Sequence, residues 1–123
     1  MTKVIAYVED DRDMIDLVSI ILERHGYEVL GFNDSMDILD RLEALKPDLI
    51  LLDIMMPRVD GFEIYEGLKR KQTTSTIPIV VISAMKKAVD QIEQESRIKV
   101  EGCLVKPFTI SELAELVSKV LSN

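Results

Sequence analysis

Acidic side chains follow two short apolar runs of the sequence. Glu9 and Asp10 come directly after Val4–Val8, and Asp53 comes directly after Leu49–Leu52. Two carboxylates about 5 Å apart repel by roughly 3 kcal/mol at an effective dielectric near 20, so such a group would favour a bound cation. Oxygen ligands prefer a hard ion, and one or two direct carboxylates completed by water suit Mg²⁺. If the two runs lie side by side, these three acids predict a Mg²⁺ site.

Asp53 could also react with a phosphoryl group. Aspartate can attack phosphorus and form an acyl phosphate, and the protein groups around such a transfer mainly position the reactants and stabilise charge. Ser83 follows a further apolar run, and Lys106 follows another. The hydroxyl would hydrogen-bond a phosphoryl oxygen, and the ammonium would balance its charge together with Mg²⁺. The residue types therefore predict a phosphoryl-accepting site centred on Asp53.

Short runs rich in Val, Ile and Leu alternate with amphipathic segments along the chain. The runs are typical of strands buried on both faces, and they are Val4–Val8, Glu28–Phe32, Leu49–Leu52, Ile79–Ile82 and Cys103–Val105. The segments between them predict helices around residues 14–22, from near Ser35 to Leu45, at Phe62–Arg70, at Lys86–Arg97 and from Thr109 onward. His25-Gly26 fits a helix stop, and Thr109 with Glu112 fits a capping box.

This alternation predicts an α/β fold with a doubly wound five-stranded parallel sheet, strand order 2-1-3-4-5, of the flavodoxin-like (βα)5 type. Ligands of such sheets bind outside the carboxyl ends of the strands, where the strand order reverses between the first and third strands. The acidic, hydroxyl and ammonium groups named above all follow strand ends, so this fold would gather them at one edge. Asp11 is expected to be solvated or to cap the first helix.

Composition limits the classes of function. The 123 residues suit one domain, taken as residues 1–123, and 47% hydrophobic with 30% charged residues can build a core. The net charge of −7 makes nucleic acid a poor direct partner. Cys103 is the single cysteine, which fits a reducing compartment, and no apolar run approaches the roughly 18–20 residues that span a bilayer. We expect a cytoplasmic protein without membrane contact.

The sequence resembles the receiver domain of two-component response regulators over nearly its whole length. The matching pieces are Glu9-Asp10, Asp53 with Met56-Pro57 and Asp60-Gly61, Ser83-Ala84, and Lys106-Pro107-Phe108. The resemblance implies that Asp53 is the phosphoacceptor and that Asp10, Asp53 and the Met55 backbone carbonyl bind Mg²⁺ directly. Glu9 would assist through water.

The same resemblance implies roles for the remaining groups and for partners. Lys106 and Ser83 would contact the phosphoryl group, Ser83 would shift on activation, and the Lys106–Pro107 bond would be cis. The donor would be a phosphohistidine of a sensor histidine kinase or phosphotransfer protein, and the switched surface would act on a downstream output protein or domain, with homodimerisation common in the family. The domain would catalyse its own phosphorylation and dephosphorylation as a signalling switch, either alone or as the N-terminal part of a longer regulator.

Three positions depart from the family pattern or tune it. Cys103 stands three residues before the lysine, where the family usually carries Tyr or Phe, so we expect a smaller response of the surface formed by the fourth helix, fifth strand and fifth helix. Met55 and Met85 stand two residues after the acceptor and after the serine. Neither side chain can orient an attacking water by hydrogen bonding, which predicts slow to moderate loss of the phosphoryl group.

Three other functions remain open from the residues alone. An aspartyl-phosphate phosphatase would need a second acid two residues after its nucleophile, and Met55 stands there. A flavin-binding module of the same topology would need a phosphate loop rich in Ser, Thr and Gly after the first strand, where the acidic residues would repel the cofactor. An interaction module that works without phosphorylation is compatible with Cys103, although the complete acidic set favours the switch.

Overall fold

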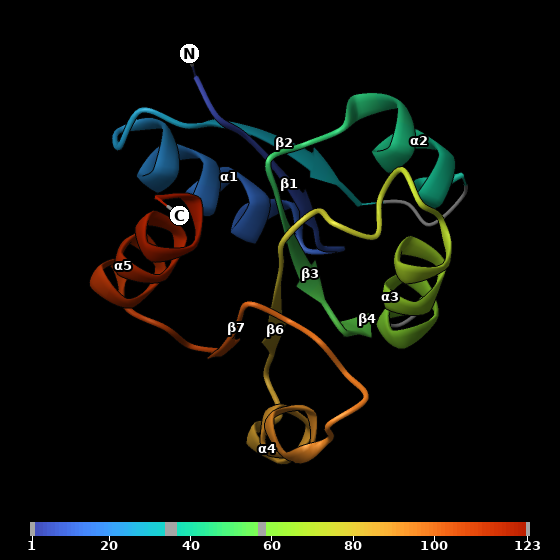
Figure 1. Cartoon of the computed structure of the whole chain (residues 1–123). Helices are drawn as coiled ribbons and strands as arrows, with labels where there is room; N and C mark the ends of the chain where they lie inside the picture. The colour runs from blue at the N-terminus through green and yellow to red at the C-terminus, as the bar shows by residue number, and fades with distance from the viewer. Residues whose placement is uncertain (1, 34–36, 57–58, 123) are drawn as a thin grey trace.

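The computed structural model describes residues 2–33, 37–56 and 59–122. Its main sheet contains the strands β1 (Val4–Val8), β2 (Glu28–Phe32), β3 (Leu49–Asp53), β6 (Ile79–Ser83) and β7 (Gly102–Val105). All neighbouring strands are parallel, in the order β2-β1-β3-β6-β7. Counted along these five strands, this is the order 2-1-3-4-5, so the predicted fold class is confirmed (Figure 1). Ser35 and Pro57, which the sequence places at a helix start and in a motif, lie outside the described residues.

Helices connect the strands as predicted. They are α1 (Arg12–Glu23), α2 (Ile38–Leu45), α3 (Gly61–Arg70), α4 (Lys86–Gln94) and α5 (Ile110–Leu121). The fourth helix ends at Gln94 rather than at the predicted Arg97, because Glu95 adopts extended backbone and its N–H closes the helix onto the Gln91 and Ile92 carbonyls. A short antiparallel pair, β4 (Met55–Met56) with β5 (Val59–Asp60), was not predicted from the sequence.

Local side-chain chemistry sets the helix ends. Asp11 is the N-cap of α1, where its Oδ1 accepts hydrogen bonds from the backbone of Asp13 and Met14, so the expected capping role is confirmed. Gly26 follows α1 with a φ of 90°, a conformation that glycine adopts without a Cβ clash. At α5, Thr109 and Glu112 form the predicted capping box.

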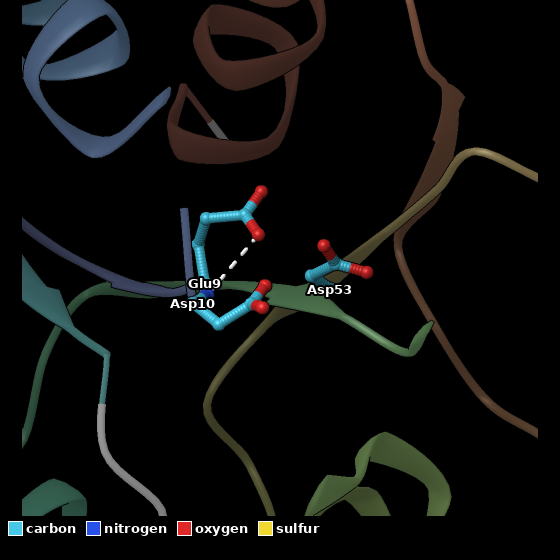
Figure 2. Close-up of side chains that lie close together, drawn as sticks. All are labelled: Glu9, Asp10 and Asp53. Atoms are coloured by element: carbon cyan, nitrogen blue, oxygen red, sulfur yellow. Dashed lines mark hydrogen bonds between the residues drawn. The ribbon is translucent and has the colours of Figure 1, made fainter. Parts of the chain in front are cut away.

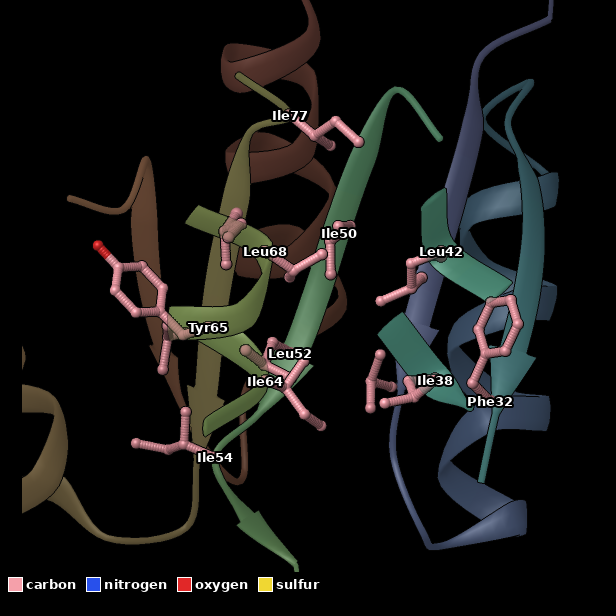
Figure 3. Packing of buried hydrophobic residues seen from close by; sticks show 14 of the residues in the cluster. Phe32, Ile38, Leu42, Ile50, Leu52, Ile54, Ile64, Tyr65, Leu68 and Ile77 are labelled. Carbon is pink, nitrogen blue, oxygen red and sulfur yellow. The ribbon is translucent and has the colours of Figure 1, made fainter. Parts of the chain in front are cut away.

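The sheet is buried between two helix layers. Val18 and Leu22 of α1 and Val117 of α5 pack on one face. On the other face, α2, α3 and α4 cover the strands, as Figure 3 shows for Ile38 and Leu42 of α2 and for several α3 residues beside β3. All five residues of β3 are buried, and fully burying one large aliphatic side chain contributes about 1.5–3 kcal/mol. This two-sided burial explains the nearly continuous apolar run before Asp53.

Candidate phosphoryl-acceptor site

The alternation of side chains along the strands decides which groups share one face. Tyr7 of β1, Leu51 of β3 and Leu104 of β7 belong to the core on the α1 and α5 face. Two positions further along stand Glu9, Asp53 and Lys106: Asp53 ends β3, and the other two directly follow β1 and β7. Side chains two positions apart along an extended segment point to the same face. The three polar groups therefore continue the α1 and α5 face at the carboxyl edge of the sheet.

Lys106 bridges two of these carboxylates. Its Nζ lies 2.8 Å from Oδ2 of Asp53 and also donates a hydrogen bond to Oε1 of Glu9. The Glu9 and Asp53 side chains are almost fully buried, and the Lys106 side chain is 20% exposed. Burial alone lowers the pKa of Lys106, but the hydrogen bonds and charges of Asp53 and Glu9 outweigh it and raise the pKa above its ordinary value. Lys106 therefore stays an ammonium between two acids.

Asp10 completes an acidic cluster that could hold a metal ion. One carboxylate oxygen each from Glu9, Asp10 and Asp53 lies within 4.8 Å of the others. Figure 2 shows the Glu9 and Asp10 side chains leaving the end of β1 in different directions. Desolvation, followed by a side-chain hydrogen bond with Glu9, raises the pKa of Asp10, although this residue is exposed overall. An all-oxygen donor set of this kind suits a hard divalent cation, so the residues present fit the expected metal.

Backbone contacts fix the Asp53 carboxylate. The Met55 N–H donates to Asp53 Oδ1 at 2.9 Å, and the Ile54 N–H donates to the carbonyl of Ile82 on β6 at 3.1 Å. Gly61, the first residue of α3, packs so closely against this turn that a Cβ there would be 2.4 Å from the Ile54 Cα. The Asp53–Met55 turn is thus held by main-chain contacts, and the role of the Met55 carbonyl as a metal ligand stays a prediction.

Ser83 lies on the other face of the sheet from Glu9, Asp53 and Lys106. It is fully buried, and its Oγ accepts a hydrogen bond from the Met85 N–H at 3.0 Å. Val81, two residues earlier, packs on the α2, α3 and α4 face, so Ser83 has the opposite orientation from Asp53. Its carbonyl accepts the Lys106 N–H at 2.8 Å, which ties the start of the Lys106 segment to β6. Contact between Ser83 and a phosphoryl group stays a prediction. The Lys106–Pro107 bond is cis, as the family resemblance implies.

Sequence reasoning missed the contact between Tyr7 and Glu9. The Tyr7 phenol is fully buried and donates to Glu9 Oε1 at 3.0 Å. Period-two spacing could have indicated it, because Tyr7 and Glu9 lie two positions apart on one face. The reach of the phenol along the strand depends on packing against α1 and α5, and no sequence pattern reports that packing.

Cys103 lies at the centre of β7, where it pairs with Val81 of β6. The side chain is half-buried and packs against the core on the α2, α3 and α4 face. Burial, with a smaller effect of Glu93, raises the pKa of its thiol to about 11. Cys103 is therefore a neutral, partly covered thiol at the position where the family usually carries an aromatic ring.

The fold and the acidic cluster together define a class: doubly wound α/β proteins with an acidic, lysine-bridged site at the carboxyl edge of the sheet. The family model described as the response regulator receiver domain matches residues 5–118, so the chain belongs to this family of signalling domains. The match favours the receiver over the aspartyl-phosphate phosphatase and the flavin-binding module. Within the described residues, no helix combines the length and the apolar character that crossing a bilayer requires.

Curated relatives occur both as long and as short proteins. The chain is 37% identical over 117 residues to the DNA-binding dual master transcriptional regulator RpaA of a Synechocystis strain, covering 95% of this chain and 48% of that protein. It is 31% identical over 121 residues to the alkaline phosphatase synthesis transcriptional regulatory protein PhoP of Bacillus subtilis, of which it spans 49%. The polar-differentiation response regulator DivK of Brucella ovis is 31% identical, and the match covers 99% of it.

Solved structures show the same architecture. The chemotaxis response regulator CheY4 of Vibrio cholerae superposes with a TM-score of 0.86 at 25% identity, covering 98% of this chain and 100% of that one. The bacteriophytochrome response regulator RtBRR gives a TM-score of 0.80 at 26% identity, covering 100% of this chain and 80% of that one.

Proposed function

We propose that Asp53 accepts a phosphoryl group from a phosphohistidine and that the acyl phosphate switches a partner-binding surface. In the transfer, one carboxylate oxygen of Asp53 bonds to phosphorus while the phosphorus–nitrogen bond breaks. The electron pair of that bond stays on the imidazole nitrogen, which takes a proton from solvent. In dephosphorylation, water attacks phosphorus, the bond between phosphorus and the Asp53 oxygen breaks, and inorganic phosphate leaves while Asp53 returns to the carboxylate.

The contact between Lys106 and Asp53 carries this proposal. An ammonium 2.8 Å from Asp53 Oδ2 stands where negative charge arrives on a transferred phosphoryl group. The Met55 N–H on Asp53 Oδ1 keeps the carboxylate oriented during attack. Ser83 is proposed to leave its bond with the Met85 N–H and to hydrogen-bond a phosphoryl oxygen, which would move the start of α4. The same residues would serve phosphorylation and dephosphorylation.

We assign the proposed Mg²⁺ to Asp10, Asp53 and the Met55 carbonyl, with Glu9 assisting through water. When bound, Mg²⁺ would neutralise charge on the phosphoryl oxygens. Glu9 Oε2 accepts the Asp11 N–H at 3.4 Å, the longest of its bonds, so this is the oxygen best placed to accept a water. The carboxylates of Asp10 and Asp53 would contact the cation, while Lys106 contacts Asp53 at its Oδ2.

The proposed partners follow from this chemistry. A sensor histidine kinase or phosphotransfer protein would supply the phosphohistidine, and an output protein or domain would read the switched face, with homodimerisation as one form of output. Matches to about half of RpaA and PhoP and to nearly all of DivK support both an N-terminal and a stand-alone arrangement. The net charge of −7 supports protein partners rather than direct nucleic-acid binding, and the single cysteine supports a cytoplasmic setting.

Intact-mass spectrometry after incubation with acetyl phosphate and Mg²⁺ tests the acceptor role. We expect the wild type to gain one phosphoryl group and Asp53→Asn to gain none. Asp13→Asn, which changes an exposed aspartate of α1, is the matched control and should behave as the wild type. Phosphorylation that persists in Asp53→Asn, or no added mass in the wild type, would contradict the proposal.

A further inference from the structure

The Glu9 carboxylate is surrounded by hydrogen-bond donors. Oε1 accepts from the Tyr7 hydroxyl at 3.0 Å and from the Lys106 ammonium. Oε2 accepts from the backbone N–H groups of Asp10 at 3.1 Å and Asp11 at 3.4 Å. An ionised carboxylate offers about four lone-pair sites. These four donors match the four sites of Glu9, and only the long contact from the Asp11 N–H could give way to a water. The other acids of the cluster keep oxygens open to a cation.

Among these four donors, Tyr7 supplies a neutral side-chain hydroxyl, whereas the others are the Lys106 ammonium and two backbone N–H groups. Its ring is fully buried in the core beneath α1 and α5, so the phenol has one available direction along β1. An ionised carboxylate can only accept hydrogen bonds, so the Tyr7 hydroxyl is the donor in this contact. An unpaired buried carboxylate oxygen costs free energy, so without the Tyr7 hydroxyl Glu9 would bind another donor or a cation more strongly.

We propose that Tyr7 is a positioning residue that commits Glu9 to anchoring Lys106 and keeps the Glu9 carboxylate out of direct metal coordination. By occupying one site of Oε1, the phenol reduces the pull of Glu9 on the ammonium, so Lys106 remains shared with Asp53. By completing the donor set of Glu9, it leaves direct binding of the cation to Asp10 and Asp53. This inference rests on the proposed function and adds a residue that touches neither the phosphoryl group nor the metal.

Calorimetric titration with Mg²⁺ gives a readout independent of phosphorylation. In Tyr7→Phe, the freed lone pair of Glu9 should bind the cation, so the Kd for Mg²⁺ should fall by about three- to tenfold. This change corresponds to part of the free energy of one charge-assisted hydrogen bond. At saturating Mg²⁺, the rate of phosphorylation by acetyl phosphate should fall, because a Glu9 carboxylate that binds the cation no longer anchors Lys106 beside Asp53. Tyr27→Phe is the control, since Tyr27 directly precedes β2 and so lies at the amino end of the strands, whereas the acidic cluster lies at their carboxyl end. An unchanged or raised Kd in Tyr7→Phe overturns the proposal.

A double-mutant cycle tests whether Tyr7 acts through Glu9. In a Glu9→Gln background, adding Tyr7→Phe should leave the Kd for Mg²⁺ unchanged, because the carboxylate is already gone. An effect of equal size in both backgrounds would show that Tyr7 acts in another way and overturns the proposal. If the wild type gains a phosphoryl group and Tyr7→Phe has the same Kd for Mg²⁺ as the wild type, only this inference fails. If the wild type gains no phosphoryl group, the proposed function fails.

A measurement on the wild type covers the case in which Tyr7→Phe does not fold. With tyrosine labelled at Cζ with ¹³C, the Tyr7 signal should move no more than the Tyr27 signal when Mg²⁺ is added, because the phenol stays on Glu9. A large shift confined to Tyr7 would mean that Glu9 releases the phenol to bind the cation, and it overturns the proposal.

Discussion

Lys106 Nζ lies 2.8 Å from Asp53 Oδ2, although the two residues are 53 positions apart in the chain. The same ammonium contacts Glu9, 97 positions away. Asp53 is the last residue of β3, and Glu9 and Lys106 directly follow β1 and β7, so the charges that meet at this point come from the ends of three strands. The ammonium lies between two buried acids. In the proposed function it would also balance the charge of a phosphoryl group on Asp53.

Replacing Lys106 with Met should destabilise the fold at neutral pH. Two nearly buried carboxylates would lose their shared cation, at a cost of about 1–3 kcal/mol in the free energy of unfolding. Because the pKa of Lys106 is raised in the folded state, its contribution is present at neutral pH and is lost only as strongly alkaline pH removes the proton. Urea unfolding measures the loss, which Mg²⁺ should partly restore. The exposed Lys87→Met is the control, and equal stability of both variants would refute the expectation.

Replacing Met55 with Asn should shorten the life of the acyl phosphate. Met55 is 48% exposed beside the acceptor, and an amide there could orient an attacking water where a thioether does not. We expect slow to moderate hydrolysis in the wild type and a clearly faster rate in Met55→Asn, measured by the decay of the phosphorylated mass. Met55→Leu keeps an apolar side chain and should decay as the wild type. A wild-type half-life of seconds that Met55→Asn leaves unchanged would argue against this role.

Replacing Cys103 with Tyr should enlarge the response of the α4, β7 and α5 face. The small thiol on β7 cannot sweep the volume of an aromatic ring, so in the wild type we expect the change to pass through Ser83 and its loop. NMR spectra with and without beryllofluoride and Mg²⁺ compare the two proteins. Shift changes of equal size on this face would show that ring volume at position 103 does not set the response.

The Cys103 thiol should react slowly with iodoacetamide in the folded protein. A thiol pKa raised from 9.0 to about 11 leaves roughly one-hundredth of the ordinary thiolate fraction at pH 8. The alkylation rate should rise about tenfold per pH unit up to that pKa, and urea-unfolded protein should react about a hundred times faster at pH 8. Equal rates in folded and unfolded protein would mean that burial does not control this thiol.

Gly61→Ala should cost more stability than Gly67→Ala in the same helix. A Cβ at Gly61 would lie 2.4 Å from the Ile54 Cα, which is backbone, whereas one at Gly67 would lie 2.5 Å from the end of the Leu39 side chain. Side chains can move aside more easily than main chain, so we expect a loss of about 2–3 kcal/mol for Gly61→Ala and less for Gly67→Ala. Urea unfolding of both variants gives the comparison, and equal losses would contradict it.

The sequence by itself determined the strands and the groups at their ends, and the chain length favoured the flavodoxin-like strand order. Apolar runs such as Leu49–Leu52 predict buried parallel strands, and the alternation with helices predicts the doubly wound sheet that the structure confirms. The sequence also indicated that Glu9, Asp10 and Asp53 would crowd together, and their oxygens lie within 4.8 Å. Local patterns sufficed here because strand ends in a parallel sheet share one edge.

Only the tertiary structure decided how the polar groups share their hydrogen bonds. Lys106 joins Glu9 as well as Asp53, Tyr7 completes the donors of Glu9, and Ser83 stays with the Met85 N–H. The short β4–β5 pair and the early end of α4 at Gln94 likewise follow from contacts around them. Such pairings depend on strand register and on packing to within about an ångström, because hydrogen bonds weaken steeply beyond their normal length. Residue types and spacing along the chain carry no information at that precision.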